Sequence, residues 1–148
     1  MSVLLELECR GVKLLACDAA AVGEPPARLL VDLRKVNEIP ADSLAGLEAA
    51  EVKRASIPVT LDTWSEQDVD ALRREFNRGV SPVAVVSQGG RRAALLIVQH
   101  VARAQGWELD QALRESAAVA WNARERQLLS DYLDRHRRDR LTNPLLVV

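Results

Sequence analysis

One segment of the chain combines an apolar run, two glycines and two arginines in an order that suits anion binding. Val83–Val86 is apolar, Ser87–Gly90 follows as a glycine-containing loop, and Arg91 and Arg92 begin the next helical segment. The unsatisfied amides and the positive dipole end of a helix N-terminus attract oxyanions, and glycines let the backbone wrap around them. A guanidinium from the first turn would add a bidentate contact to phosphate or sulfate. The predicted anion-binding residues are Ser87, Gln88, Gly89, Gly90, Arg91 and Arg92.

The same segment has a plainer interpretation, as an ordinary strand-to-helix connection with both arginines in solvent.

The cysteine content indicates neither a disulfide framework nor a metal site. The two cysteines, Cys9 and Cys17, are too few for a disulfide framework or a zinc site of standard ligand spacing, and we interpret them as buried thiols. We therefore expect no metal and no cofactor.

The charge balance argues against several classes of partner. The 148 residues carry 20 basic and 21 acidic side chains, a formal charge of −1, which is not the electrostatic pattern of a nucleic-acid or membrane binder. The longest apolar run, Ala93–Val98, is far too short to span a bilayer. The first residues carry no basic side chain, and only four residues separate the acidic Glu6 from Met1. We therefore expect no secretory signal and a cytoplasmic location.

The elements that must position this loop alternate between strand and helix signals, which favours one α/β domain over residues 1–148. We expect a mainly parallel central sheet of four to five strands flanked by helices, with an N-terminal hairpin. The predicted strands are Val3–Cys9, Val12–Cys17, Leu29–Arg34, Val52–Val59 and Pro82–Val86. The predicted helices are a short one from Pro40 to about Ala50, one opened by Thr63 with Glu66 or by Ser65 with Asp68, Arg92–Gln105, one from Trp107 to about Ala120, and about Asn122–Arg138.

The last predicted helix has an arginine-rich face and an apolar stripe of Leu128, Leu129, Tyr132 and Leu133. Such a stripe is typical of packing on the domain itself, and the alternative is a partial homodimer face. The apolar tail Leu141–Val148 either docks on the domain or extends a sheet edge.

From Leu29 to about Trp121 the chain resembles the cysteine-phosphatase superfamily, specifically the small bacterial dual-specificity-phosphatase-like proteins of the DUF442 type. Val31–Arg34 is similar to an early strand of that family, and Ile57–Val59 is similar to its Ile-Pro-Val strand ending. The catalytic loop of the family reads cysteine, five residues, arginine, with a glycine three positions after the cysteine. With Gly89 on that glycine, Arg92 falls on the arginine and Val86 falls on the cysteine.

The mismatch at Val86 decides the expected function, because a hydrocarbon side chain cannot replace the thiolate nucleophile of the family. Ser87 is a weak substitute that lies one residue late, and Asp62 is a weak candidate for the general acid of the resemblance. Ala93 stands where the family has serine or threonine. The resemblance thus implies a catalytically inactive phosphatase-like domain that keeps an anion-binding loop and has a binding or regulatory role.

The expected ligand is a phosphate- or sulfate-like anion or a phosphorylated molecule, with a protein partner or a homodimer as further alternatives. Two other functions stay open at this point. One is a weakly active hydrolase that uses a nucleophile other than cysteine. The other is a structural module for dimerisation or interaction, in which the loop is only a turn.

Overall fold

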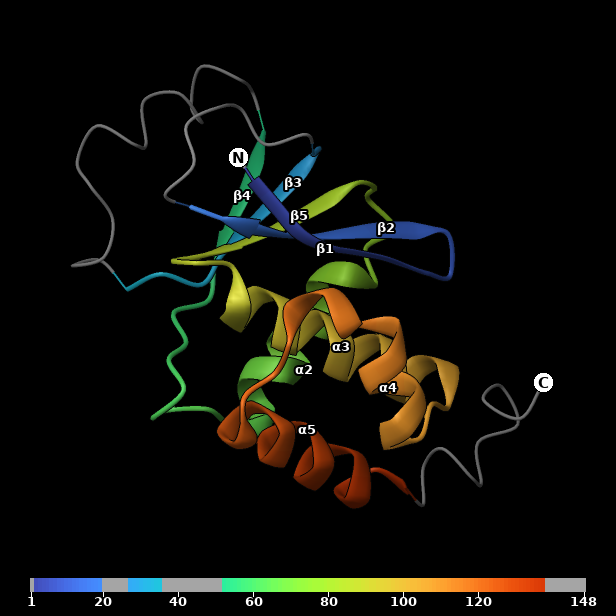
Figure 1. Cartoon of the computed structure of the whole chain (residues 1–148). Coiled ribbons are helices and arrows are strands. Elements are labelled where there is room, and N and C mark those ends of the chain that lie inside the picture. Colours follow the sequence, from blue (N-terminus) through green and yellow to red (C-terminus); the bar gives the residue numbers. More distant parts are fainter. Residues whose placement is uncertain (1, 20–26, 36–51, 138–148) are drawn as a thin grey trace.

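The computed structural model describes residues 2–19, 27–35 and 52–137, which form one five-stranded sheet with helices on one of its faces (Figure 1). The strands lie in the order β1-β2-β5-β3-β4, so that β5 is central. Only β1 and β2 pair antiparallel, and the remaining pairs are parallel. The predicted α/β class, the mainly parallel sheet and the N-terminal hairpin are confirmed. The strands are β1 (Ser2–Cys9), β2 (Val12–Asp18), β3 (Leu29–Asp32), β4 (Lys53–Ser56) and β5 (Val83–Ser87).

A two-residue turn joins β1 to β2. Arg10 and Gly11 both have positive φ, 52° and 80°, and Cys9 pairs with Val12 across the turn. Two consecutive left-handed residues match the right-handed twist of the strands, which is why such turns close tight hairpins. Arg10 adopts this conformation without being glycine, so the hairpin forms on a weaker turn signal than Asn-Gly.

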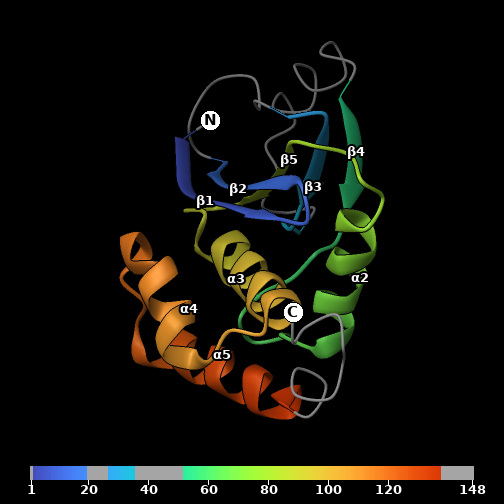
Figure 2. The same cartoon turned by 90° about the vertical axis from the view of Figure 1, so that its right-hand side faces the viewer.

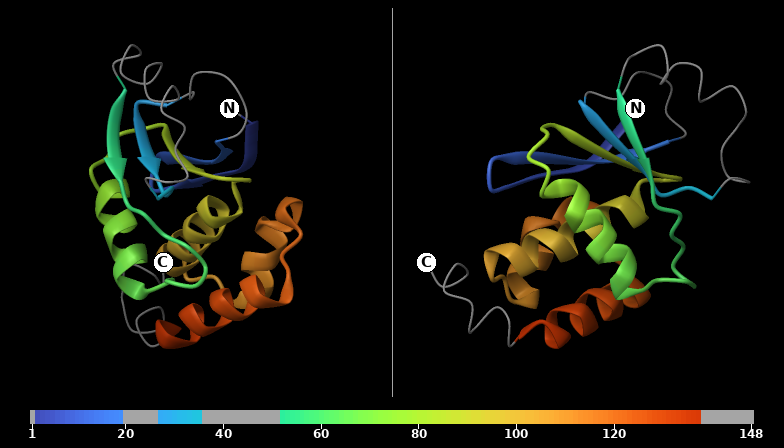
Figure 3. Two further views of the ribbon diagram at one scale, coloured as in Figure 1. Left: turned by 90° about the vertical axis from the view of Figure 1, so that its left-hand side faces the viewer. Right: turned by 180° about the vertical axis from the view of Figure 1, so that it is seen from behind.

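The helices of the described residues lie together below the sheet, and α3 runs between the sheet and α5 (Figures 2 and 3). Ser65 and Asp68, rather than Thr63 and Glu66, form the capping box that begins α2. Thr63 instead exchanges hydrogen bonds with Thr60. The helices are α2 (Glu66–Phe76), α3 (Arg91–Gln105), α4 (Leu109–Glu115), the 3₁₀ helix η3 (Ala117–Val119) and α5 (Ala123–Arg135).

The two faces of the sheet bury separate apolar clusters. Val83 and Val85 belong to the larger cluster, which contains the buried face of α3. Ala84 and Val86 belong to a smaller cluster on the opposite face, together with Leu15, Cys17 and Leu30. Successive strand side chains point to opposite faces, so Val86 and its neighbour in the sequence, Ser87, point in different directions. Because of this alternation, the Val86 and Ser87 side chains lie on opposite faces of the sheet where the loop after β5 begins.

Three predicted elements differ from the observed ones. The single helix predicted from Trp107 to Ala120 is α4 followed by η3. Ser116 ends α4 with its N–H still donating to the Ala112 carbonyl at 3.2 Å, and η3 follows through the tighter hydrogen bond from the Val119 N–H to the Ser116 carbonyl at 3.1 Å. The strand predicted over Val52–Val59 is shorter, Lys53–Ser56, although the Ile57 and Val59 N–H groups beyond it still donate to the Asp32 and Leu33 carbonyls. The strand predicted over Leu29–Arg34 ends at Asp32, whose carboxylate accepts the Arg34 N–H. The predicted helix over 40–50 and the tail Leu141–Val148 lie outside the described residues.

The apolar stripe of α5 is used within the domain. Leu129, Tyr132 and Leu133 are buried in the larger core, and Leu128 packs partly buried against it. The packing interpretation of this stripe is therefore confirmed. Cys9 and Cys17 are both free, buried thiols, as predicted.

Candidate functional site

The loop after β5 lies at the carboxyl end of the central strand, the edge where open α/β sheets bind ligands. Gly89 and Gly90 both have left-handed backbone conformations, with φ of 74° and 78°, and the Gly90 N–H donates to the Ser87 carbonyl at 3.2 Å. A Cβ on Gly90 would come within 3.3 Å of backbone atoms of Cys17 and Asp18. The glycines are thus required by the turn and by its close approach to β2.

One amide of the loop and one of the first turn of α3 are bonded to side-chain oxygens of the chain itself. The Gly89 N–H donates to Asp18 Oδ1 at 3.0 Å, and the Ala93 N–H donates to Ser87 Oγ at 3.2 Å. A carboxylate of the chain therefore occupies an amide that was predicted to face a ligand. Asp18 was not among the predicted site residues; it directly follows the predicted strand Val12–Cys17 and lies 71 positions from Gly89.

Neither residue at the nucleophile position faces an open site. The Val86 side chain is fully buried in the smaller cluster, on the face of the sheet opposite α3. Ser87 is also fully buried, and its hydroxyl oxygen accepts the helix amide described above. Asp62 is exposed, in the turn between β4 and α2. Neither the Val86 nor the Ser87 side chain is therefore exposed at this edge of the sheet.

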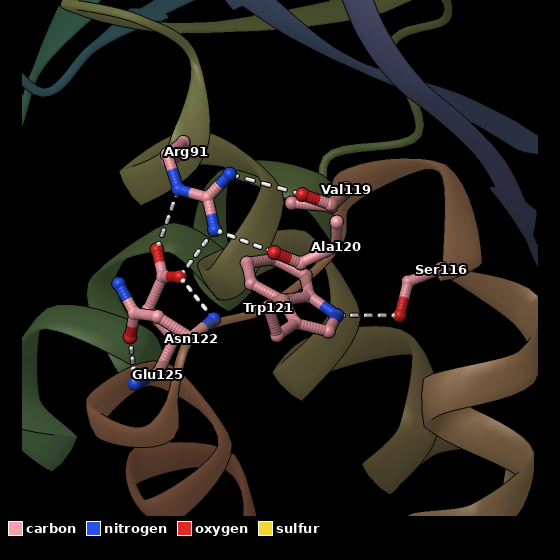
Figure 4. A network of polar contacts seen from close by, with 7 residues as sticks. All are labelled: Arg91, Ser116, Val119, Ala120, Trp121, Asn122 and Glu125. Atoms are coloured by element: carbon pink, nitrogen blue, oxygen red, sulfur yellow. Dashed lines mark hydrogen bonds and ion pairs between the residues drawn. The ribbon is translucent and has the colours of Figure 1, made fainter.

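The Arg91 side chain turns toward α5 rather than over the loop (Figure 4). Its Nε donates to Glu125 Oε2 at 3.0 Å, its Nη2 donates to Glu125 Oε1, and Nη1 donates to the Val119 carbonyl at 2.9 Å. Its guanidinium also lies 5.8 Å from the centre of the Trp121 ring. The hydrogen bond to Glu125 raises the pKa of Arg91, so this group stays charged. These contacts give Arg91 a structural role at the start of α3.

Arg92 reaches the other side of the loop. Its Nη1 donates to the Val59 carbonyl, at 2.6 Å, in the segment that follows β4. This contact places the second guanidinium between the β5–α3 loop and the segment before α2. The segment that contains Val59 was not among the predicted site residues. Parallel neighbouring strands end at the same edge of a sheet, so its proximity to the loop follows from the strand order.

A pocket of about 400 Å³ lies at this edge. It brings together three of the predicted residues, Gln88, Arg91 and Arg92, with residues that the sequence analysis did not assign to the site. Ser87, Gly89, Gly90 and Asp62 do not line it. The complete lining is Thr60, Leu61, Gln88, Arg91, Arg92, Asn122 and Glu125. Its charged lining residues are two arginines and one glutamate, and Arg91 and Glu125 are paired with each other.

Solved structures share this arrangement of sheet and helices. A putative phosphatase from Neisseria meningitidis is 24% identical with a TM-score of 0.60, over 72% of this chain and 79% of that chain. TpbA from P. aeruginosa is 21% identical with a TM-score of 0.58, over 79% and 75%. The core catalytic domain of the PP-IP phosphatase SIW14 from S. cerevisiae, in complex with citrate, is 20% identical with a TM-score of 0.59, over 81% and 77%. This chain has the cysteine-phosphatase fold.

The cysteine-phosphatase fold confirms the architecture expected from the sequence resemblance. No family model and no curated protein sequence matches the chain.

Across residues 2–19, 27–35 and 52–137, no helix is long and apolar enough to cross a bilayer. The same residues contain no cluster of three or more histidine, cysteine or acidic side chains that could hold a metal ion.

Proposed function

We propose that this chain is a phosphatase-fold protein that binds a phosphate-bearing ligand without hydrolysing it. One observation carries the proposal: a pocket lined by Arg92 and Gln88 opens beside the β5–α3 loop, while Val86 and Ser87 are fully buried beneath that loop. The fold thus keeps a cationic pocket and lacks a reactive group at its base.

The absence of hydrolysis follows from the placement of the nucleophilic residue types. Cysteine phosphatases form a covalent intermediate on a thiolate. Cys17 pairs in register with Val86, but it is fully buried and burial raises its pKa, which disfavours the thiolate. Cys9 lies at the other end of the hairpin. The Ser87 hydroxyl is held as the acceptor for the start of α3, which is a capping role.

Binding is supported by the charge and the shape of the pocket. Arg92 extends from the first turn of α3, where the helix dipole also favours an anion. Because Asp18 occupies the Gly89 amide, Arg92 rather than a full ring of amides supplies the main contact. The P. aeruginosa protein has been solved as a cysteine-to-serine variant in complex with phosphotyrosine, and the S. cerevisiae protein with citrate. Both ligands are anions, in agreement with the proposal.

Calorimetric titration with inorganic phosphate and with tungstate tests binding. We expect saturable binding to the wild-type protein and at least a tenfold loss of affinity in Arg92→Met. Arg124→Met, which removes an exposed arginine at the start of α5, is the matched control and keeps wild-type affinity. A ligand at 100 times its dissociation constant stabilises the fold by about 2.7 kcal/mol, so thermal unfolding gives an independent readout.

The two alternatives make different predictions in these assays. A hydrolase with a non-cysteine nucleophile would turn over an aryl phosphate above the buffer rate and would lose that activity in Ser87→Ala. A purely structural module would show neither binding nor an effect of Arg92→Met. We expect binding without turnover, and turnover that depends on Ser87 would refute the proposal.

A further inference from the structure

A second pocket, of about 170 Å³, lies at the opposite end of β5 from the loop. It forms where the β1–β2 turn meets the end of α2 and the middle of α3. Lys13 N donates to Ser81 Oγ at 3.0 Å and fixes the hairpin against the segment that leads into β5. The lining residues are Cys9, Arg10, Val12, Phe76, Asn77, Gly79 and His100. The volume corresponds to about six water molecules, or to one organic molecule of comparable size.

His100 is the unexplained group in this pocket. Its side chain is only 5% exposed, and Nδ1 has no hydrogen-bond partner among the residues that the structure describes. One side of the ring packs against Phe76, with 4.8 Å between the ring centroids. A buried polar atom without a partner costs about 1–3 kcal/mol.

The groups around His100 are mostly cationic. Burial, followed by Arg73, Arg10 and Arg103, lowers the pKa of His100 to about 3, so the imidazole is neutral. Arg73 Nε has no partner within the described part of the chain. The Asp70 carboxylate lies 3.6 Å from Arg103 and is about half exposed.

The uncharged neighbours do not offset these cations. Burial raises the pKa of the Cys9 thiol, so Cys9 contributes no negative charge. The Tyr132 hydroxyl accepts a hydrogen bond from Arg103 at 3.2 Å. The pocket is therefore small, partly apolar and surrounded by an excess of positive charge. That combination suits an anion with an apolar body better than a bare inorganic ion.

We propose that this pocket binds a small aliphatic monocarboxylate of about three or four carbons. Its apolar body lies against Val12 and Phe76, and its carboxylate faces Arg10 and the Asn77 amide, beside the His100 ring. The assignment is independent of the proposed phosphate pocket, because no residue lines both.

The test is an NMR titration of the His100 ring signals with propionate. The chain has two histidines, so His136→Gln assigns the His100 signal directly. We expect a saturable shift of the His100 signal with propionate, no shift with propionamide at the same concentration, and a much weaker response to inorganic phosphate. Propionate binding should also raise the pH at which His100 titrates, because an anion stabilises the imidazolium.

Arg10→Asn is the informative variant. Asparagine is favoured at left-handed turn positions, so the hairpin is kept while the charge is removed. We expect at least a tenfold weaker affinity for propionate. Lys13→Asn, which removes an exposed charge from the same hairpin without touching the pocket lining, is the control and keeps wild-type affinity.

Three results would overturn the proposal: no shift of His100 at saturating propionate, an equal shift with propionamide, or binding that survives Arg10→Asn and is lost in Arg92→Met. The last result would assign the carboxylate to the phosphate pocket instead. The two sites are tested with separate variants. If propionate does not bind, the proposed phosphate-binding function is unaffected. If Arg92→Met does not reduce phosphate binding, the monocarboxylate proposal is unaffected.

Discussion

Arg91 and Glu125 form a two-point ion pair that joins the start of α3 to the start of α5. Glu125 is only 2% exposed and has a second task, because its Oε1 accepts the Asn122 N–H at 3.0 Å in the capping box of α5. One carboxylate thus fixes two helix N-termini. The two adjacent arginines at the start of α3 thus differ in their contacts: Arg91 pairs with Glu125, and Arg92 donates to the Val59 carbonyl.

Arg91→Met should therefore destabilise the fold. Removing one partner leaves the Glu125 carboxylate buried without its cation, and such losses reach several kcal/mol. Because the Arg91 side chain is 39% exposed, water compensates in part, and we expect a loss of about 2 kcal/mol. Urea unfolding followed by circular dichroism measures it.

Arg124→Met is the control for that experiment, since Arg124 is exposed one residue before Glu125. Exposed substitutions of this kind change stability by about 0.5 kcal/mol or less. If Arg91→Met and Arg124→Met unfold at the same urea concentration as the wild type, the ion pair does not stabilise the junction of α3 and α5.

Val86→Cys should not create a phosphatase. The new thiol would lie in the smaller cluster with Leu15, Cys17 and Leu30, on the face of the sheet away from α3. Buried, it would remain protonated and out of reach of a ligand beside Arg92. We expect aryl-phosphate turnover at the buffer rate in this variant, and slow labelling by iodoacetamide in the folded protein. Rapid labelling together with turnover would show that position 86 faces the pocket.

Asp18→Asn should strengthen phosphate binding. The asparagine oxygen can still accept the Gly89 N–H, so the loop keeps its shape while a negative charge near the pocket is removed. We expect affinity for phosphate to rise about threefold, because a full charge near an exposed anion changes the binding free energy by roughly 0.6 kcal/mol. Calorimetric titration checks this. Affinity that is unchanged or reduced would mean that Asp18 does not compete with the ligand.

The strand–glycine–helix pattern of the loop was predictable because its signals are local. Val83–Val86 is apolar, Ser87 and Gln88 lead to two glycines, and the helix begins at Arg91. The single helix predicted over Trp107–Ala120 was also a local inference, and the chain instead changes at Ser116 from α4 to the tighter η3. Helical spacing alone does not reveal that change.

The partners of the loop residues were not predictable in the same way, because they come from distant parts of the chain. Asp18 lies 71 positions from Gly89, and Glu125 lies 34 positions from Arg91. The sequence held one signal that bears on the contact between Arg91 and Glu125. Asn122 and Glu125 have capping-box spacing, which predicts the start of α5. Nothing in the sequence says that this helix start meets the start of α3, since that contact depends on tertiary packing.

The stability of the protein should fall in mild acid because of His100. Burial, and then the nearby arginines, lower the pKa of His100 in the folded state to about 3, below the ordinary value of about 6.5 in an unfolded chain. Between these two values the unfolded state binds the proton more readily, so the free energy of unfolding decreases as the pH falls. The limiting slope from this one group is about 1.4 kcal/mol per pH unit.

Urea unfolding at pH 7, 6 and 5 measures this dependence in the wild type and in His100→Leu, which keeps a side chain of similar apolar size. The variant should lose stability less steeply over this range than the wild type. Equal slopes in the two proteins would show that His100 does not take up a proton on unfolding.

The most direct measurement is a crystal structure of the protein soaked with tungstate, whose heavy atom gives an anomalous signal. A phosphate-binding pocket predicts one strong anomalous peak between Gln88 and the Arg92 guanidinium, in the pocket bounded by Thr60 and Leu61. The peak should disappear in crystals of Arg92→Met. An empty pocket at saturating tungstate, or a peak that persists in the variant, would contradict the central claim that Arg92 is the anion-binding residue of this fold.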